Sequence, residues 1–411
     1  MHTTLAPEYR DTPEGQAAQA IVRKCVHCGF CTATCPTYQL LGDELDGPRG
    51  RIYLIKQVLE GQTPTRATQL HLDRCLSCRN CESTCPSGVD YGHLLDIGRL
   101  LVDAKVPRPL PQRAVRWALK EGLPSPLFAP ALKLGQALRP LLPKALQAKV
   151  PARQAAGALP QRQHARRVLL LAGCVQPAMA PNIHGATVRV LDAAGIQGLL
   201  APQAGCCGAV RFHLNDQDGG KAQMRANIDA WWPFIEPADP RLAVEALVMN
   251  ASGCGVTVKD YGHVLRDDSA YAARAARVSA LTRDLSEYLP DLAAALHGKV
   301  RAAGQGALVF HPPCTLQHGQ QLRGGVERHL AALGFTVRLA AQESHLCCGS
   351  AGTYSVLQAP LAQTLRERKL GHLQAAAGET IISANIGCIT HLQSGTAVPV
   401  RHWVEVLDQA L

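Results

Sequence analysis

The sequence CVHCGFCTATCP, which runs from Cys25 to Pro36, returns 50 residues later as CLSCRNCESTCP, from Cys75 to Pro86. Both copies have the spacing C-x2-C-x2-C-x3-C-P. In this pattern three closely spaced thiolates hold three irons of a cubane, while the fourth cysteine, set apart by a longer spacer and a proline, ligates the other cluster. The copies therefore predict two [4Fe-4S] clusters with crossed ligands. The expected ligands are Cys25, Cys28, Cys31 and Cys85 for the first cluster and Cys75, Cys78, Cys81 and Cys35 for the second.

Two other uses of so many cysteines fit the sequence less well. Disulfide frameworks are typical of small secreted chains, whereas this chain has 411 residues and begins MHTTLAPEYRDTPEG, without the basic and apolar regions of a signal peptide. Zinc sites usually take two spaced pairs of ligands, not two identical quartets that end in Cys-Pro. The 16 cysteines therefore indicate metal chemistry in a reducing compartment, and we expect a cytoplasmic protein.

Length and charge indicate several parts with different roles. The chain is long enough for two or three domains, and no apolar run approaches the ~20 residues that span a bilayer. The net charge is +10, and the stretch from Lys105 to Arg167 carries 13 Lys or Arg against the single acid Glu121, so the rest of the chain is nearly neutral. Aromatic residues make up only 4% and do not interleave with the basic ones, so a nucleic-acid partner is not expected.

The basic stretch is expected to connect two parts of the molecule, and we place this connector at residues 105–165. Ten of the 27 prolines lie between residues 105 and 167, where they divide the chain into short helical pieces. Pieces such as LFAPALKLGQALRPLLPKALQ are apolar and basic together, which suits peripheral contact with an anionic cell membrane or with an acidic partner. A connector that packs only on its own domains is the alternative.

Residues 1–104 are expected to form an α-helical ferredoxin domain that holds the two clusters. Apolar periodicity and turn signals predict helices over residues 13–24, 49–61 and 89–105, and strand signals are weak. Four arginines lie near the cysteines in the sequence: Arg49, Arg51, Arg74 and Arg79. They are either solvated surface charges or cations that favour the reduced clusters and raise their potentials.

From residue 166 onward, hydrophobic strands alternate with helices, and the pattern occurs twice. We place the first unit at residues 166–299 and the second at residues 300–411. The strands are expected to lead directly to Cys174, Cys206, Cys207 and Cys254 in the first unit and to Cys314, Cys347, Cys348 and Cys388 in the second. Corresponding cysteines lie 140, 141 and 134 residues apart. Each unit contains the triplet Cys-Cys-Gly, so we name the two stretches the first and second CCG units.

Strands that alternate with helices form parallel sheets, and ligands bind beyond the carboxyl ends of the strands. The predicted fold is therefore an α-helical two-cluster domain followed by a duplicated, Rossmann-like α/β unit. Four thiols should converge in each copy and could bind an additional iron–sulfur cluster or another metal. Inert buried cysteines are the alternative. No strand followed by G-x-G-x-x-G is present, so this chain is not expected to bind a dinucleotide itself.

The motifs above, together with the runs QLLGDELDGPRGRIYLIKQ and NIDAWWP, resemble the iron–sulfur subunit of bacterial glycolate oxidase over nearly the whole chain. The resemblance implies the electron-transfer subunit of a multi-subunit oxidoreductase. Flavin-containing subunits with FAD would oxidise glycolate to glyoxylate, and this chain would pass the electrons to a quinone or another acceptor. No catalytic residue is then expected here, because the substrate site belongs to a partner subunit.

Other functions stay open at the level of sequence. The cysteine motifs also occur in iron–sulfur subunits of lactate and glycerol-3-phosphate dehydrogenases and in heterodisulfide reductases. In the reductases the last cysteine element is C-x-x-C, whose final position here is Thr257 or His391, so thiol–disulfide chemistry is a weaker hypothesis. A zinc-binding scaffold without redox function is the third. His391 is weighed as a metal ligand against a structural role, while His311 and His345 lie nearest the cysteines in the sequence. We expect the second unit, with His391, to hold a metal more firmly than the first.

Overall fold

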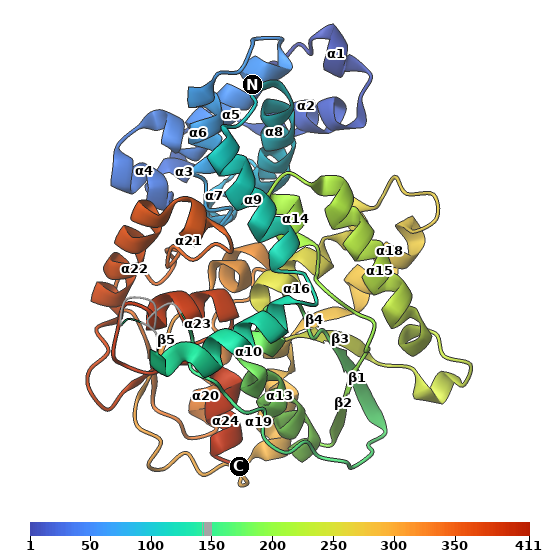
Figure 1. Ribbon diagram of the computed structural model, residues 1–411, viewed down its shortest axis with the longest axis vertical. Coiled ribbons are helices and arrows are strands. Elements are labelled where there is room, and N and C mark those ends of the chain that lie inside the picture. The colour runs from blue at the N-terminus through green and yellow to red at the C-terminus, as the bar shows by residue number, and fades with distance from the viewer. Residues whose placement is uncertain (142, 144–149) are drawn as a thin grey trace.

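The computed structural model describes residues 1–141, 143 and 150–411 (Figure 1). Leu142 and residues 144–149, which belong to the predicted basic connector, lie outside the described residues. The N-terminal domain is built from helices: α1 (Pro7–Arg10), α2 (Pro13–Lys24), α3 (Phe30–Ala33), α4 (Pro36–Leu41), η1 (Glu44–Asp46), α5 (Pro48–Leu59), α6 (Arg66–Asp73), α7 (Asn80–Thr84) and α8 (Tyr91–Lys105). The prediction of a helical first domain is confirmed.

The three predicted helices of this domain are α2, α5 and α8. The start of α2 is fixed by Thr12, whose hydroxyl accepts a hydrogen bond from the Gly15 N–H, and by Pro13 in the first turn. The three helices pack against one another around fully buried side chains such as Val22, Ile55 and Leu94. This core holds the two cysteine motifs in place, because each motif begins where a helix of the domain ends.

The connector forms helices α9 (Leu110–Gly122) and α10 (Phe128–Leu138) and the turn η2 (Arg139–Leu141). Part of the connector's positive charge is neutralised by an acidic side chain of the helical domain, since Arg108 and Arg116 both pair with Asp73 of α6. Glu121 pairs with Arg211 of the first CCG unit, so α9 bridges the two parts (Figure 1). Among the described helices, none combines the length and the apolar character needed to cross a bilayer.

The first CCG unit has an α/β fold, in which helices connect the strands of a four-stranded sheet. Its elements are β1 (Arg166–Leu170), α12 (Gln176–Met179), α13 (Pro181–Ala193), β2 (Ile196–Leu200), α14 (Ala209–His213), α15 (Gln217–Ile235), η3 (Pro240–Leu242), β3 (Ala246–Met249), α16 (Ser252–Lys259), α17 (Tyr261–Val264), α18 (Ala272–Leu281), β4 (Thr282–Asp284), η4 (Leu285–Tyr288) and α19 (Leu289–Leu296). All strands are parallel in the order β2-β1-β3-β4, with Leu169 opposite both Leu199 and Leu247.

The second CCG unit repeats this design. Its elements are β5 (Leu308–Phe310), η5 (Thr315–Gly319), α20 (Gly325–Ala332), β6 (Val337–Leu339), α21 (Tyr354–Leu357), α22 (Ala359–Leu373), β7 (Thr380–Ser383), α23 (Ile386–Gln393), β8 (Val400–His402) and α24 (Trp403–Gln409). The strand order β6-β5-β7-β8 matches that of the first sheet, so the predicted duplication is confirmed. The fourth strand of each sheet was not predicted, because β4 and β8 are only three residues long and carry a central arginine.

The two CCG units share one hydrophobic core. Helix α13 of the first unit packs on α24 of the second, and α19 of the first unit packs on α20 of the second. The buried side chains in this core come from strands and helices of both units and include Leu170, Leu289, Phe310 and Trp403. The units are therefore joined as one body (Figure 1). Residues that follow strands of both sheets line one cavity together with Cys75 and Cys78 of the helical domain.

The cysteines lie beyond the strands, not directly after them as the sequence predicted. Cys174 follows the end of β1 by four residues, and Cys254 and Cys388 lie in the first turns of α16 and α23. The glycine of each Cys-Cys-Gly triplet has a left-handed backbone, with φ of +93° at Gly208 and +91° at Gly349. The loops need this turn to carry each cysteine pair back across the carboxyl ends of the strands.

Candidate metal centres

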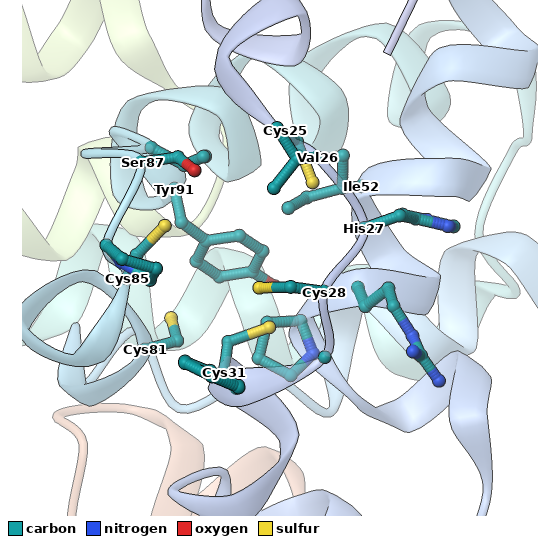
Figure 2. Close-up of a pocket in the computed structure, with 16 residues that line it drawn as sticks. Cys25, Val26, His27, Cys28, Cys31, Ile52, Cys81, Cys85, Ser87 and Tyr91 are labelled. Atoms are coloured by element: carbon teal, nitrogen blue, oxygen red, sulfur yellow. The ribbon is translucent and has the colours of Figure 1, made fainter.

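The first predicted quartet gathers at one edge of the helical domain. Figure 2 shows Cys25, Cys28, Cys31 and Cys85 around a small pocket that Tyr91 also lines. Burial raises the pKa of the Cys31 thiol to about 11. The thiols whose charges add to this rise are those of Cys25, Cys85 and Cys28. The fourth cysteine of the second motif therefore lies among the first three cysteines of the first motif.

The second quartet lies deeper, towards the CCG units. Cys81 also lines the first pocket. Burial raises the pKa of its thiol, and the charges of Cys78, Cys75 and Cys35 raise it further. Burial also raises the pKa of Cys78, and the largest charge acting on it is that of Cys314 in the second CCG unit. The second quartet therefore lies next to cysteines of the second CCG unit.

The two motifs share a backbone conformation that wraps the chain around each quartet. His27 and Gly29 in the first motif have positive φ angles of 60° and 86°, and Ser77 and Arg79 in the second have 52° and 56°. Left-handed residues turn successive N–H groups toward one side, where they can face an anion. In the second motif the Ser77 N–H lies 3.4 Å from the Cys75 Sγ.

The four arginines near the cysteines have different surroundings. Arg49, Arg74 and Arg79 pair with carboxylates, those of Glu44, Asp46 and Asp260. Arg51 is fully buried, donates to the carbonyl oxygen of His71 over 2.7 Å and also pairs with Asp46 over 3.4 Å. Burial would lower the pKa of Arg51, but nearby negative charges raise it, led by the Cys75 thiolate. Arg51 is therefore a buried cation beside the second quartet that also pairs with Asp46.

In the first CCG unit the four thiols form a chain of neighbours. Cys174 interacts with Cys206, Cys206 with Cys207, and Cys207 with Cys254. The thiols of Cys174 and Cys207 and the N–H of Gly208 lower the pKa of Cys206. Cys174 and Cys254 are only partly buried.

The second CCG unit holds the same chain of thiols in a fully buried setting. The Sγ atoms of Cys314 and Cys347 are 3.8 Å apart, Cys347 interacts with Cys348, and Cys348 with Cys388. All four cysteines are buried. The N–H of Gly349 donates to the Cys347 Sγ over 3.4 Å, as the N–H of Gly208 acts on Cys206 in the first unit.

One histidine belongs to the second group of thiols. A ring nitrogen of His311, the Cys348 Sγ and the Cys388 Sγ all lie within 4.8 Å of one another. The histidine weighed from the sequence, His391, instead donates from Nε2 to the Ala362 carbonyl over 3.1 Å. It lines the neighbouring cavity but is not part of this group. The signal in the sequence was the short spacing between His311 and Cys314, which does not reveal that the ring turns toward Cys348.

A cavity of about 660 Å³ joins the three inner groups of cysteines. Its lining includes Cys75 and Cys78 of the second motif, as well as cysteines from both CCG units. The wall toward the second unit is tight, because Leu76 packs with Cys314 and Cys347, and Cys78 packs against this cluster. The first unit faces the same cavity through Cys174, Cys206, Cys207 and Cys254.

The arrangement fits two cubanes in the helical domain. The cysteines are free of disulfides, each quartet brings together the expected donors, and the same two backbone positions are left-handed in both motifs. Four thiolates are the donor set of a [4Fe-4S] cluster. The remaining eight cysteines also gather, four in each CCG unit, as donors for soft metals.

Comparisons with known proteins agree with this division. The profile described as a 4Fe-4S dicluster domain matches residues 21–89, and the one described as a cysteine-rich domain matches residues 168–259 and 308–393. The chain is 54% identical over 413 residues to the glycolate oxidase iron–sulfur subunit of Escherichia coli (strain K12), covering 100% of this chain and 99% of that protein.

Two more distant relatives match a smaller share of the chain at lower identity. The probable glycolate oxidase iron–sulfur subunit of Bacillus subtilis (strain 168) is 28% identical over 90% of this chain and 88% of its own length. Lactate utilization protein A of Geobacillus kaustophilus (strain HTA426) is 24% identical and covers 59% of this chain and 98% of its own length.

Proposed function

The chain belongs to the family of glycolate oxidase iron–sulfur subunits, and on this premise we propose that it transfers electrons in a complex that oxidises glycolate to glyoxylate. The observation that carries the proposal is the gathering of two thiol quartets in the domain that matches the 4Fe-4S dicluster profile. When bound there, two [4Fe-4S] clusters would supply one-electron transfer. The reaction on glycolate itself belongs to a partner subunit that carries FAD.

The proposed ligands follow the two quartets. The first cluster is assigned to Cys25, Cys28, Cys31 and Cys85, and the second to Cys75, Cys78, Cys81 and Cys35. Two electrostatic contacts support the assignment of each motif's fourth cysteine to the cluster of the other motif. Cys85 is among the charges that act on Cys31, and Cys35 is among those that act on Cys81. The Asn80 side chain also donates to the Thr34 carbonyl over 3.0 Å, which ties the two motifs together.

The partner subunit is proposed to dock beside the first quartet. Cys28 is exposed, and the apolar side chains on either side of it, Val26 and Phe30, are 68% and 62% exposed. Exposed apolar residues that cluster beside a functional group mark an interaction surface. Electrons would enter at this face and continue inward, because the second quartet lies between the first quartet and the CCG units.

A test of the docking face is to replace Phe30 by glutamate. Co-purification with the flavin subunit should fall at least tenfold, because a charge would be buried in an apolar contact. Val356→Glu, at a residue that is 56% exposed on the second CCG unit, is the matched control and should co-purify normally. Unchanged iron content shows that the Phe30 variant keeps its clusters, and unchanged co-purification of this variant would refute the docking face.

The connector is proposed to bring the complex to a membrane, where a quinone could accept the electrons. Trp117 on α9 and Leu134 on α10 are 64% and 61% exposed, with Arg113 and Lys133 beside them. Apolar and basic side chains together bind an anionic lipid surface. The double variant Trp117→Glu/Leu134→Glu should lose binding to vesicles that contain phosphatidylserine. Leu242→Glu, an exposed site elsewhere, should not. Binding that is indifferent to salt or to the double variant contradicts this role.

The substrate is tested with the reconstituted complex. The chain and its flavin partner, purified together without oxygen, should reduce an artificial quinone with glycolate. Lactate and glycerol 3-phosphate should support much slower reduction. Cys28→Ser should abolish quinone reduction while leaving flavin reduction by glycolate intact, because the partner holds the substrate. Equal or faster turnover of lactate would identify a lactate-oxidising complex instead.

A further inference from the structure

The His311 ring is buried without a partner of its own. This residue lies immediately after β5, is 1% exposed, and neither Nδ1 nor Nε2 has a hydrogen-bond partner among the described residues. Leaving a buried polar group unpaired costs about 1–3 kcal/mol, so such groups call for an explanation. Two sulfur atoms lie close to the ring, since a ring nitrogen of His311 is within 4.8 Å of the Cys348 and Cys388 Sγ atoms.

The group around this ring has five donors in two linked parts. One part is the trio of His311, Cys348 and Cys388, and the other is the pair of Cys314 and Cys347, whose Sγ atoms are 3.8 Å apart. The peptide bond between Cys347 and Cys348 links the two parts. A single zinc ion takes four ligands, so one such ion would leave a donor unused. A centre with several irons offers more separate coordination points, and iron accepts both thiolate and imidazole.

We propose that His311 is a ligand of an iron–sulfur centre held in the second CCG unit by Cys314, Cys347, Cys348 and Cys388. The proposal concerns only the ligands of this centre and does not depend on which substrate the complex oxidises. One ring nitrogen would use its free lone pair on iron, which accounts for one of the two ring nitrogens that have no hydrogen-bond partner among the described residues.

Lys369 and Asn385 lie beside the proposed centre and would stabilise the negative charge of its thiolates. Lys369 is 2% exposed, and its Nζ donates to the Glu343 carbonyl over 2.5 Å. The thiols of Cys348, Cys347 and Cys314 are among the charges that act on this ammonium group. The Asn385 amide donates to the Cys388 Sγ over 3.7 Å. A cluster of four thiolates would be costly to bury without such a cation and such donors.

The first CCG unit lacks the equivalent ligand. The residue three positions before Cys174 is Leu171, an apolar residue buried in the core of that unit. Thr257, which stands where related reductases have a fifth cysteine, uses its hydroxyl to donate to the Gly253 carbonyl over 3.0 Å. The proposed centre is therefore specific to the second unit.

The experiment detects nitrogen coordination in the full chain, purified without oxygen. Pulsed electron paramagnetic resonance of the reduced protein should show a strongly coupled 14N nucleus, replaced by 15N when only histidine is labelled. The eight proposed ligands in the helical domain are all cysteines, so this signal reports on the second CCG unit. Wild-type iron should exceed the roughly eight atoms per chain that two cubanes need.

Variants then identify the histidine. His311→Ala should lose the histidine coupling and the iron in excess of about eight atoms per chain. His311→Cys should regain that iron without the nitrogen coupling. His391→Ala, whose ring bonds to a carbonyl, is the matched control and should keep both signals. The proposal is overturned if the labelled wild type shows no histidine coupling, if iron stops at about eight, if zinc fills the site, or if only His391→Ala removes the coupling.

Discussion

The two CCG units have the same strand order and the same chain of four thiols, yet their surroundings differ. In the first unit, Cys174 and Cys254 are partly exposed, and the buried polar residues bond to one another, as when Asn250 donates to the Thr187 hydroxyl over 2.9 Å. In the second unit, all four cysteines are buried, and the His311 ring has no hydrogen-bond partner among the described residues. Duplication has kept the scaffold, and a few side chains decide what each copy can bind.

The units also differ in how they meet the helical domain. The second unit contacts the second quartet through its cysteines, since Cys78 packs against the cluster that contains Cys314 and Cys347. The Ser83 hydroxyl lies 2.9 Å from His318 Nδ1. Burial lowers the pKa of His318 to about 4, so the neutral ring donates from Nε2 to the His345 carbonyl and accepts at Nδ1. The first unit is held instead by the charged pairs of Asp260 with Arg79 and His93. The second unit is thus the one whose cysteines pack against the second quartet.

The largest expected effect tests whether the second quartet links the two regions. Cys35→Ser should remove the second cluster and with it about four irons, and should leave the second CCG unit without its electron donor. Cys85→Ser should remove the first cluster, whose pocket is lined only by residues of the helical domain among those described. Each variant should lower quinone reduction at least a hundredfold. Iron analysis and spectra decide, and loss of the cluster in the variant's own motif would show that the ligands are not crossed.

The second prediction compares the two CCG units directly. Cys347→Ser should lower iron to about eight atoms per chain, whereas Cys206→Ser should leave the wild-type value unchanged, because only the second unit has a fifth donor. Both variants remove a cysteine from corresponding triplets, so they are matched controls for each other. Equal iron loss from both variants would show that the two units bind metal alike.

The third prediction concerns the core that the units share. Trp403 lies in the joint core and Trp231 in the core of the first unit alone, and both are fully buried. Replacing either tryptophan by alanine should lower the free energy of unfolding by about 3–5 kcal/mol. Hydrogen exchange should accelerate in both units for Trp403→Ala and only in the first unit for Trp231→Ala. Faster exchange confined to the second unit in Trp403→Ala would contradict a joint core.

The smallest effect concerns pH and the first unit. Burial would lower the pKa of His93, but its hydrogen bond to Asp260 and the charge of that carboxylate raise it. Burial would raise the pKa of Asp260, yet His93 and Arg79 lower it to about 2. The contribution of protonated His93 to the free energy of unfolding is therefore complete below about pH 6.5 and is lost as the pH rises through its raised pKa. The contribution of ionised Asp260 to the free energy of unfolding is present above about pH 4 and is lost as the pH falls toward 2.

This ion pair should be worth about 1 kcal/mol to the attachment of the first unit. His93→Gln should therefore lower the Tm more at pH 6 than at pH 8.5. The exposed His297→Gln serves as control and should lower it at neither pH. A loss of Tm that is the same at both pH values would mean that His93 contributes by packing on His263, whose ring stacks 3.9 Å away, and not by its charge.

Much of the fold was predictable because its signals are local. Helix α2 has the predicted bounds, since proline, a threonine cap and an apolar stripe all lie within one short segment. The parallel sheets followed from hydrophobic strands that alternate with helices. The short strands β4 and β8 were missed, because TRD and VRH carry no apolar run and pair only when a neighbouring strand is present.

The sequence alone determined the two quartets and the duplicated cysteine units, because ligand spacing is written in consecutive residues and constrains the chain before it folds. Only the tertiary structure decided which histidine meets the second set of thiols. His391 occupies the expected sequence position, but the turn of α23 points it to the Ala362 carbonyl, while the end of β5 carries His311 to Cys348 and Cys388. The tertiary structure also placed Cys78 against Cys314, more than 200 residues away in the chain. Such contacts depend on how sheets and helices pack, and packing joins residues whose spacing in the sequence carries no signal.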